Sequence, residues 1–230
     1  MSFQVLKRAC LSIINLTLGH FGWKLQRDLP DYVLFEYEDY DEYRATQIKW
    51  NVIKLENVWA DAQVLDVVTA RVINSLGKDG LFALCHGSRN GFEQGYLSEQ
   101  LGGTILGTDI SETASQFPNS VVHDFHDIKA DWLKKADFIY SNSLDQSWNP
   151  KEALRVWVEQ LRIGGLLFVE MSEGHSPNHA SKMDPFGVKP EYFAYLLSQW
   201  MGHKISVEVL PAAKSNPPMQ IWLYEIKRIS

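Results

Sequence analysis

The sequence predicts an α/β fold: a doubly wound sheet that is mostly parallel, ends in an antiparallel hairpin and is preceded by N-terminal helices. Three observations predict it. From Gly80 onward, short apolar runs alternate with helix-like stretches, which is the pattern of a parallel sheet with crossover helices. Two β-rich runs, 204–210 and 220–226, close the chain, and such a pair can finish a sheet as a hairpin. With 230 residues, 45% of them hydrophobic, the chain can bury the necessary core.

Residues 1–36 are expected to form an amphipathic helix and a polar connector. The segment 3–18 carries Lys7 and Arg8 on the edge of an apolar face. Its apolar stretch falls short of the roughly 20 residues that a membrane span requires, and no clear cleavage site follows it. The helix either lies on a membrane surface or packs against the domain or a partner.

A helical cap is expected over residues 37–79, ahead of the sheet. The apolar side of its first helix is marked by Trp50, Ile53, Leu55 and Trp59. A polar face of the same helix carries Arg44, Gln47, Asn51 and Lys54, which either cover a ligand or are simply solvated. The second helix has a valine-rich stripe from Val64 and ends at Gly77.

The core is expected over residues 80–230. Its parallel strands are predicted at 81–85, 104–107, 121–122, 136–141 and 166–171, and its helices at 92–101, 151–161 and 190–200. The turn Gly164-Gly165 precedes the fifth strand, and a Pro-rich loop is predicted over 211–218.

Composition excludes several functions. A net charge of −6 argues against a nucleic-acid partner, because phosphates are bound by clustered Lys and Arg. Two distant cysteines, Cys10 and Cys85, suggest neither a disulfide framework nor a zinc site, so a cytoplasmic protein is expected. No metal is expected, since the spacing of His86, His175, His179 and Asp184 matches no tight ligand motif.

A candidate ligand loop, His86 to Gly91, lies between the first apolar strand and the next helix. Backbone amides at such a position suit an anionic or polar ligand, and Gly87 and Gly91 permit a close backbone approach. An ordinary strand-to-helix turn would look the same. Asp109 ends a strand about 20 residues downstream, where an acidic residue can bind ribose hydroxyls. The alternative is that Asp109 or Ser111 caps the following helix.

Two further loops follow strands at the same predicted edge. Asp124 and Phe125 are candidates for contacts with an adenine ring, or belong to a solvated turn. Asn142 and Asp145 are candidates for the place where a methyl donor and an acceptor meet, or hold the turn before Asn149-Pro150.

These loops make residues 37–226 resemble a class I S-adenosylmethionine-dependent methyltransferase. The residues that carry the resemblance are His86–Gly91, Gly107–Asp109, His123–His126, Tyr140–Ser143 and Leu161–Leu167. Ala83 and Cys85 replace the acidic residue and first glycine of the usual signature, and Glu93 can supply a carboxylate instead. Within the superfamily, His86–Glu93 and Asp184–Gly187 resemble a group whose substrate is not settled.

The resemblance implies a Rossmann-like domain that binds S-adenosyl-L-methionine and transfers its methyl group. The implied cofactor residues are His86, Gly87, Ser88, Arg89, Gly91, Glu93, Asp109, Ile110, Asp124, Phe125 and Asn142. The candidate proton acceptors are His86, Asp145 and His175.

The expected acceptor is a small molecule or a glycan or lipid-linked group, methylated on oxygen or nitrogen. A sugar or lipid-linked acceptor is weakly preferred, and the N-terminal helix then allows peripheral membrane contact. Three alternatives stay open: a binding protein that keeps the fold without the chemistry, a nicotinamide-dependent oxidoreductase, which the missing G-x-G-x-x-G disfavours, and a transferase of another group.

Overall fold

The computed structural model describes residues 30–215 and 218–230, so the predicted amphipathic helix 3–18 lies outside the described residues. Residues 31–230 form one compact unit. None of the helices in this part of the chain is long and apolar enough to cross a membrane.

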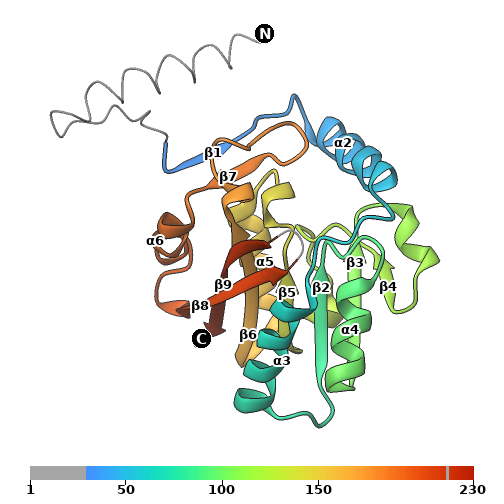
Figure 1. Cartoon of the computed structure of the whole chain (residues 1–230), viewed down its shortest axis with the longest axis vertical. Helices are drawn as coiled ribbons and strands as arrows, with labels where there is room; N and C mark the ends of the chain where they lie inside the picture. The colour runs from blue at the N-terminus through green and yellow to red at the C-terminus, as the bar shows by residue number, and fades with distance from the viewer. Residues whose placement is uncertain (1–29, 216–217) are drawn as a thin grey trace, which may run out of the picture. The chain divides into compact units, whose positions relative to one another are not determined.

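A seven-stranded sheet with the order β4-β3-β2-β5-β6-β9-β8 forms the centre of this unit (Figure 1). Its strands are β2 (Phe82–His86), β3 (Thr104–Asp109), β4 (Ser120–Val122), β5 (Ala136–Ser141), β6 (Leu161–Ser172), β8 (Ile205–Ser215) and β9 (Pro218–Arg228). The first five are parallel, whereas β9 runs antiparallel to both β6 and β8. The predicted fold class is therefore confirmed.

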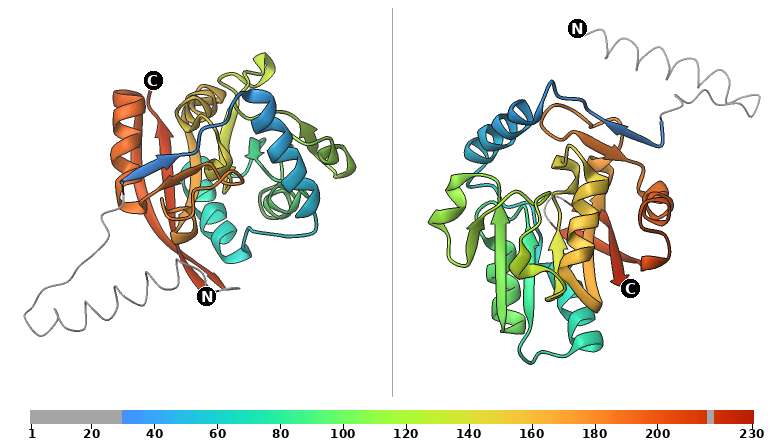
Figure 2. Two further views of the ribbon diagram at one scale, coloured as in Figure 1. Left: turned by 90° about the horizontal axis from the view of Figure 1, so that it is seen from above. Right: turned by 180° about the vertical axis from the view of Figure 1, so that it is seen from behind.

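Helices cover both faces of the sheet. The helices are α2 (Tyr40–Ile53), α3 (Ala62–Leu76), α4 (Phe92–Leu101), α5 (Pro150–Gln160) and α6 (Pro190–Met201). Figure 1 shows α3 and α4 in front of the sheet, and Figure 2 shows α5 behind it. Two apolar clusters result, one between the sheet and α3 and α4, the other between the sheet and α5 and α6. Because both faces are buried, the inner strands read as nearly continuous apolar runs.

Parallel register brings the ligand loops to one edge of the sheet. Cys85 lies opposite Gly107 on one side and Tyr140 on the other, so the segments that follow β2, β3 and β5 leave the sheet side by side. In open α/β sheets, ligands bind outside these carboxyl ends. Beyond this edge lies α2, together with a small antiparallel pair of β1 (Tyr32–Leu34) and β7 (Phe186–Val188) (Figure 1).

The closing hairpin is longer than predicted. The residues expected to form a Pro-rich loop continue the pairing of β8 with β9 as far as Ser215 opposite Pro218. A proline is tolerated here because β8 is an edge strand and Pro218 begins its strand. The strands β1 and β7 were not predicted, since three-residue strands have too little alternation to be seen in a sequence.

The orientation of α2 also differs from the prediction. Its buried residues are Tyr43, Gln47 and Asn51, whereas Ile53, which was expected on the apolar inner side, is 60% exposed. The reason is that α2 covers the polar ligand edge of the sheet instead of an apolar core. Its polar face is therefore the inner one.

Candidate active site

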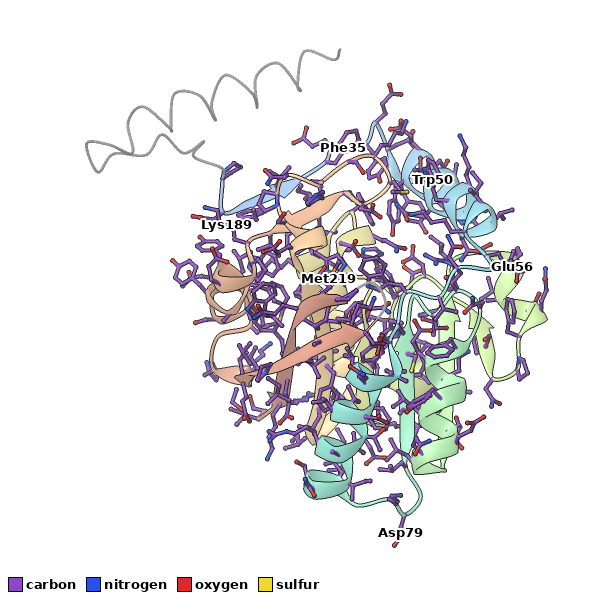
Figure 3. All side chains as sticks on the ribbon, viewed as in Figure 1. Phe35, Trp50, Glu56, Asp79, Lys189 and Met219 are labelled. Atoms are coloured by element: carbon purple, nitrogen blue, oxygen red, sulfur yellow. The ribbon has the colours of Figure 1, made fainter. Side chains whose placement is uncertain are left out.

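Two adjoining cavities lie at the carboxyl edge of the parallel strands. The larger has a volume of about 520 Å³ and is bounded by the loops after β2 and β5, residues 54–59 and the loop 174–184. The smaller, of about 30 Å³, lies between α2 and the loops after β3 and β4. Lys54, Gly87 and Asp184 line both. Figure 3 shows Trp50 and Glu56 at this end of the molecule and Asp79 at the opposite end.

The loop after β2 has a shape that requires glycine. Gly87 has φ +74°, and a Cβ there would lie 2.5 Å from Ser143 Cβ on the loop after β5. The backbone N–H groups of Gly87 and Ser88 both donate to Thr108 O, which fixes the loop against β3. The next residue, Arg89, also has a left-handed backbone, with φ +44°. Strained backbone of this kind gathers at functional sites.

Asp109 lines the smaller cavity together with Ile110. Its Oδ1 accepts a hydrogen bond from Ser111 N at 2.9 Å and its Oδ2 one from Arg89 N at 3.2 Å. Burial raises the pKa of this carboxyl above its usual value. The helix cap is Ser111, whose side chain accepts from Thr113 N. Each Asp109 oxygen thus keeps capacity to accept a further hydrogen bond from a ligand.

Asp124 and Phe125 line the same cavity. Asp124 Oδ1 accepts from the backbone N–H of His126 at 2.9 Å and pairs with its ring nitrogen at 2.6 Å, and the Tyr40 hydroxyl donates to Oδ2 at 2.7 Å. Burial alone would raise the pKa of Asp124, but the bonds from His126 and Tyr40 hold it below the usual value. An adenine amino group would therefore compete with Tyr40 for this carboxylate.

The polar face of α2 closes the smaller cavity. Gln47, Asn51 and Lys54 line it, whereas Arg44 is exposed and does not. Gln47 Nε2 donates to Met183 O at 3.0 Å, and the Thr113 hydroxyl donates to Asn51 Oδ1 at 2.7 Å. These bonds tie α2 to the loop 174–184 and to the segment after β3. Three of the four polar residues predicted on this face therefore line the cavity.

Three carboxyl groups line the larger cavity: Glu93, Asp145 and Asp184. Burial raises the pKa of Glu93 and of Asp145 to about 7 and that of Asp184 to about 6. Asn142 Nδ2 donates to Glu93 Oε1 at 3.2 Å. Asp145 Oδ1 is buried and has no hydrogen-bond partner. A buried polar atom without a partner is costly, so Asp145 is prepared to bind a proton or a donor group.

His175 lies in the wall of the same cavity as a hydrogen-bond donor. Ser172 N donates to its Nδ1 at 3.1 Å, so the proton of the neutral ring is assigned to Nε2, which lies 3.7 Å from Asp145 Oδ2. Burial lowers the pKa of His175 to about 4, and the ring is neutral near pH 7. With Nδ1 accepting a hydrogen bond and Nε2 protonated, the ring is oriented as a donor toward Asp145, and the role of His175 as proton acceptor stays a prediction.

The His86 side chain, for which cofactor contact and proton transfer were predicted, lies in the core and not in a cavity wall. The ring lines neither cavity and stacks on Trp157 at 5.1 Å. Its Nδ1 hydrogen-bonds Thr108 Oγ1 at 2.9 Å and its Nε2 bonds Gln160 Oε1 at 2.8 Å. Burial lowers its pKa to about 3. As the last residue of β2, His86 directs its side chain to the α5 face of the sheet.

Sequence reasoning missed a buried ion pair beside the larger cavity. Lys214 Nζ, on β8, lies 3.7 Å from Glu170 Oε1, on β6, and the Tyr140 hydroxyl donates to Glu170 Oε2 at 2.6 Å. Lys214 Nζ also lies 3.7 Å from the centre of the Trp59 indole and donates to Trp59 O. The one signal of this ion pair in the sequence is Glu170, an acidic residue within the otherwise apolar segment of a predicted strand.

Trp148 packs against α2 beside the smaller cavity. Its indole stacks on Tyr43 of α2, with ring centres 5.8 Å apart, and lines neither cavity. Among the residues that the structure describes, no group of three or more His, Cys, Asp or Glu side chains is arranged to hold a metal ion.

Comparison with known proteins places the fold. No family model matches the sequence, and a search of curated proteins finds no match. Among solved structures, the chain is similar to the Burkholderia thailandensis 1,6-didemethyltoxoflavin N1-methyltransferase, which holds its substrate and S-adenosylhomocysteine (TM-score 0.66, 14% identity, 85% of this chain and 92% of that one).

Two further methyltransferase structures show the same likeness. One is a putative methyltransferase in complex with the Haloferax volcanii Trm112 activator (TM-score 0.62, 14% identity, 85% and 100% coverage). The other is a putative S-adenosylmethionine-dependent methyltransferase from Methanococcus maripaludis (TM-score 0.53, 16% identity, 85% and 97% coverage). The chain thus has the fold of class I S-adenosylmethionine-dependent methyltransferases.

Proposed function

We propose that this chain is an S-adenosylmethionine-dependent methyltransferase. One observation supports this most strongly: the Asp109 carboxylate, the Gly87 loop and the carboxyl group of Asp145 line adjoining cavities at the carboxyl edge of a methyltransferase-type sheet. A ribose-binding carboxylate and a close backbone approach at this edge are what an adenosyl cofactor requires.

The donor groups present fit such a cofactor. Asp109 can accept from the ribose hydroxyls, and Ile110 and Phe125 offer apolar surface to the adenine. The sulfonium and amino-acid end would be held in the larger cavity by Gly87, Ser88, Arg89, Glu93 and Asn142. Gly91, also predicted for this role, lines neither cavity and forms the N-cap of α4. That cavity, at about 520 Å³, lies in the range of roughly 300–1,000 Å³ that small-molecule sites have. The smaller cavity is too narrow for adenine. Adenine binding would require α2 to move outward and the Tyr40–Asp124 hydrogen bond to break.

When bound, the sulfonium centre supplies an activated methyl group. The chain's own contribution is to orient the cofactor and the acceptor, to exclude water beneath α2 and the loop 174–184, and to take up a proton when the acceptor is a hydroxyl. The acceptor is a small molecule or a glycan or lipid-linked group. One similar structure is named as a methyltransferase of the small molecule 1,6-didemethyltoxoflavin. A cytoplasmic location, with the N-terminal segment against a membrane, belongs to the same proposal.

Isothermal titration with S-adenosylhomocysteine tests this function, with NADH as the comparison ligand. Micromolar binding of S-adenosylhomocysteine alone is expected. A second candidate function is a binding protein without turnover. It is favoured by the hydrogen bonds that Asp124 already accepts from His126 and Tyr40, which occupy the carboxylate expected to bind adenine. It predicts S-adenosylhomocysteine binding without methyl transfer to any acceptor, whereas absence of binding to either ligand would refute both.

A further inference from the structure

Most side chains that line the larger cavity carry a hydrogen-bonding group, while apolar atoms make up slightly more than half of its surface. Its apolar side chains, among the described residues, are Val58, Trp59 and Met183; apart from glycines, the other side chains that line it are polar or charged. Sites for flat aromatic ligands are predominantly apolar, with few polar groups. Ser88, Arg89, Glu93 and Asn142 belong to the proposed cofactor end, and the remaining lining combines polar side chains with Val58, Trp59 and Met183. An acceptor that fits this part of the cavity therefore carries hydroxyl groups and has one apolar face.

Trp59 provides a single, rigid aromatic surface in this cavity. The ammonium group of Lys214 lies 3.7 Å from the centre of its indole and is itself paired with Glu170 at 3.7 Å. Both charged side chains are buried, and Trp59 remains 38% exposed. The indole is thus held by the Lys214 cation and by a tilted contact with the His175 ring, with ring centres 5.9 Å apart. Its remaining exposed surface is the part that can pack against the C–H face of a sugar ring.

Asp145 lies in the same cavity with its Oδ1 buried and unpartnered. The nearby carboxyl groups are Glu93 and Asp184, the cations lining the cavity are Lys54 and Arg89, and His175 presents Nε2 to Asp145 Oδ2 at 3.7 Å. A hydroxyl group must lose its proton when it is methylated, whereas a neutral amine can lose it afterwards. A buried carboxylate with a free oxygen matches the requirement of a hydroxyl acceptor.

The geometry points to a pyranoside acceptor that packs its ring on Trp59 and places one hydroxyl at the Asp145 carboxyl group. This inference rests on the proposed function and selects sugar hydroxyls from the wider acceptor class. The hydroxyl oxygen forms a bond to the methyl carbon, the bond between that carbon and the donor sulfur breaks with its electron pair kept by sulfur, and the hydroxyl proton moves to Asp145. The co-reactant is the sulfonium methyl donor.

Binding of simple sugars to the full chain tests the inference. The probes are methyl α- and β-pyranosides of glucose, galactose and mannose, measured by saturation-transfer NMR with and without S-adenosylhomocysteine, with phenol and catechol as comparison probes. We expect pyranoside binding that is at least about tenfold weaker in Trp59→Ala and largely restored in Trp59→Phe. Tyr195→Ala is the matched control, because Tyr195 is an exposed aromatic residue on α6, and its affinity should stay within about twofold.

Asp145→Asn separates proton transfer from binding. It should retain affinity for the pyranoside and for S-adenosylhomocysteine while kcat for methyl transfer to that pyranoside falls at least about 100-fold. Equal turnover in this variant would overturn the role of Asp145. Two results would overturn the acceptor assignment alone. One is binding of S-adenosylhomocysteine and phenols without binding of any pyranoside. The other is a pyranoside affinity that does not change in Trp59→Ala. Pyranoside binding without any S-adenosylhomocysteine binding instead overturns the proposed function.

Discussion

Replacing Asp109 with asparagine should weaken S-adenosylhomocysteine binding by about 30- to 150-fold. Asn retains one oxygen but places an N–H group where Oδ2 now accepts from Arg89 N at 3.2 Å. The variant loses the charge and one ribose contact, and hydrogen bonds to a charged group contribute about 1.5–3 kcal/mol each. A net loss of about 2–3 kcal/mol corresponds to that change in Kd.

Isothermal titration at pH 7.5 measures this effect, and urea unfolding of the same samples shows that the variant is folded. Stability should change little, because removing a buried charge offsets the weakened bond to Arg89 N. The control is Glu112→Gln, the same chemical change at an exposed position three residues away, which should bind within about twofold of the parent. If Asp109→Asn binds within threefold of the parent, the ribose assignment is refuted.

Three other predictions concern stability. Gly87→Ala should destabilise the fold by about 2–4 kcal/mol in urea unfolding, because φ is +74° and the new Cβ would lie 2.5 Å from Ser143 Cβ; an unchanged midpoint would contradict the left-handed conformation of this loop. Lys214→Met should lower the free energy of unfolding by about 3–5 kcal/mol near pH 8, because it leaves Glu170 charged and unpaired. The double variant with Glu170→Leu should recover most of this loss. Equal stability of the single and double variants would disprove the pairing. Asp145→Asn should stabilise the chain more at pH 8 than at pH 5, and the difference between the two pH values should be at most about 3 kcal/mol. The reason is that burial raises the folded-state pKa to about 7, so folding binds a proton below that pH and stability falls as pH rises from about 4 through 7. A thermal melting series over pH 5–8 measures the difference, and a pH-independent effect would show that Asp145 titrates normally.

Local sequence determined the order and type of most core elements. Helix α4 and strand β5 occur at the predicted residues, because a glycine turn or a polar loop bounds each apolar run. The positions of the Gly87 loop and Asp109 were also predicted, since strand ends in a parallel sheet place their following residues at one edge.

Tertiary structure decided which side chains reach the ligand cavities. His86 occupies a loop position in the sequence, yet its register as the last residue of β2 turns the ring into the core against Trp157. Conversely, α2 turns Gln47 and Asn51 inward because it covers polar loops instead of apolar strands.

The ion pair of Lys214 with Glu170 joins strands that are distant in sequence, and only the pairing of β9 with both β6 and β8 brings them beside Trp59. The sequence by itself therefore determined the sheet and the edge at which the candidate site lies, because local periodicity and turn residues encode them. The direction of each side chain at that edge depends on strand register and helix orientation, which long-range packing sets.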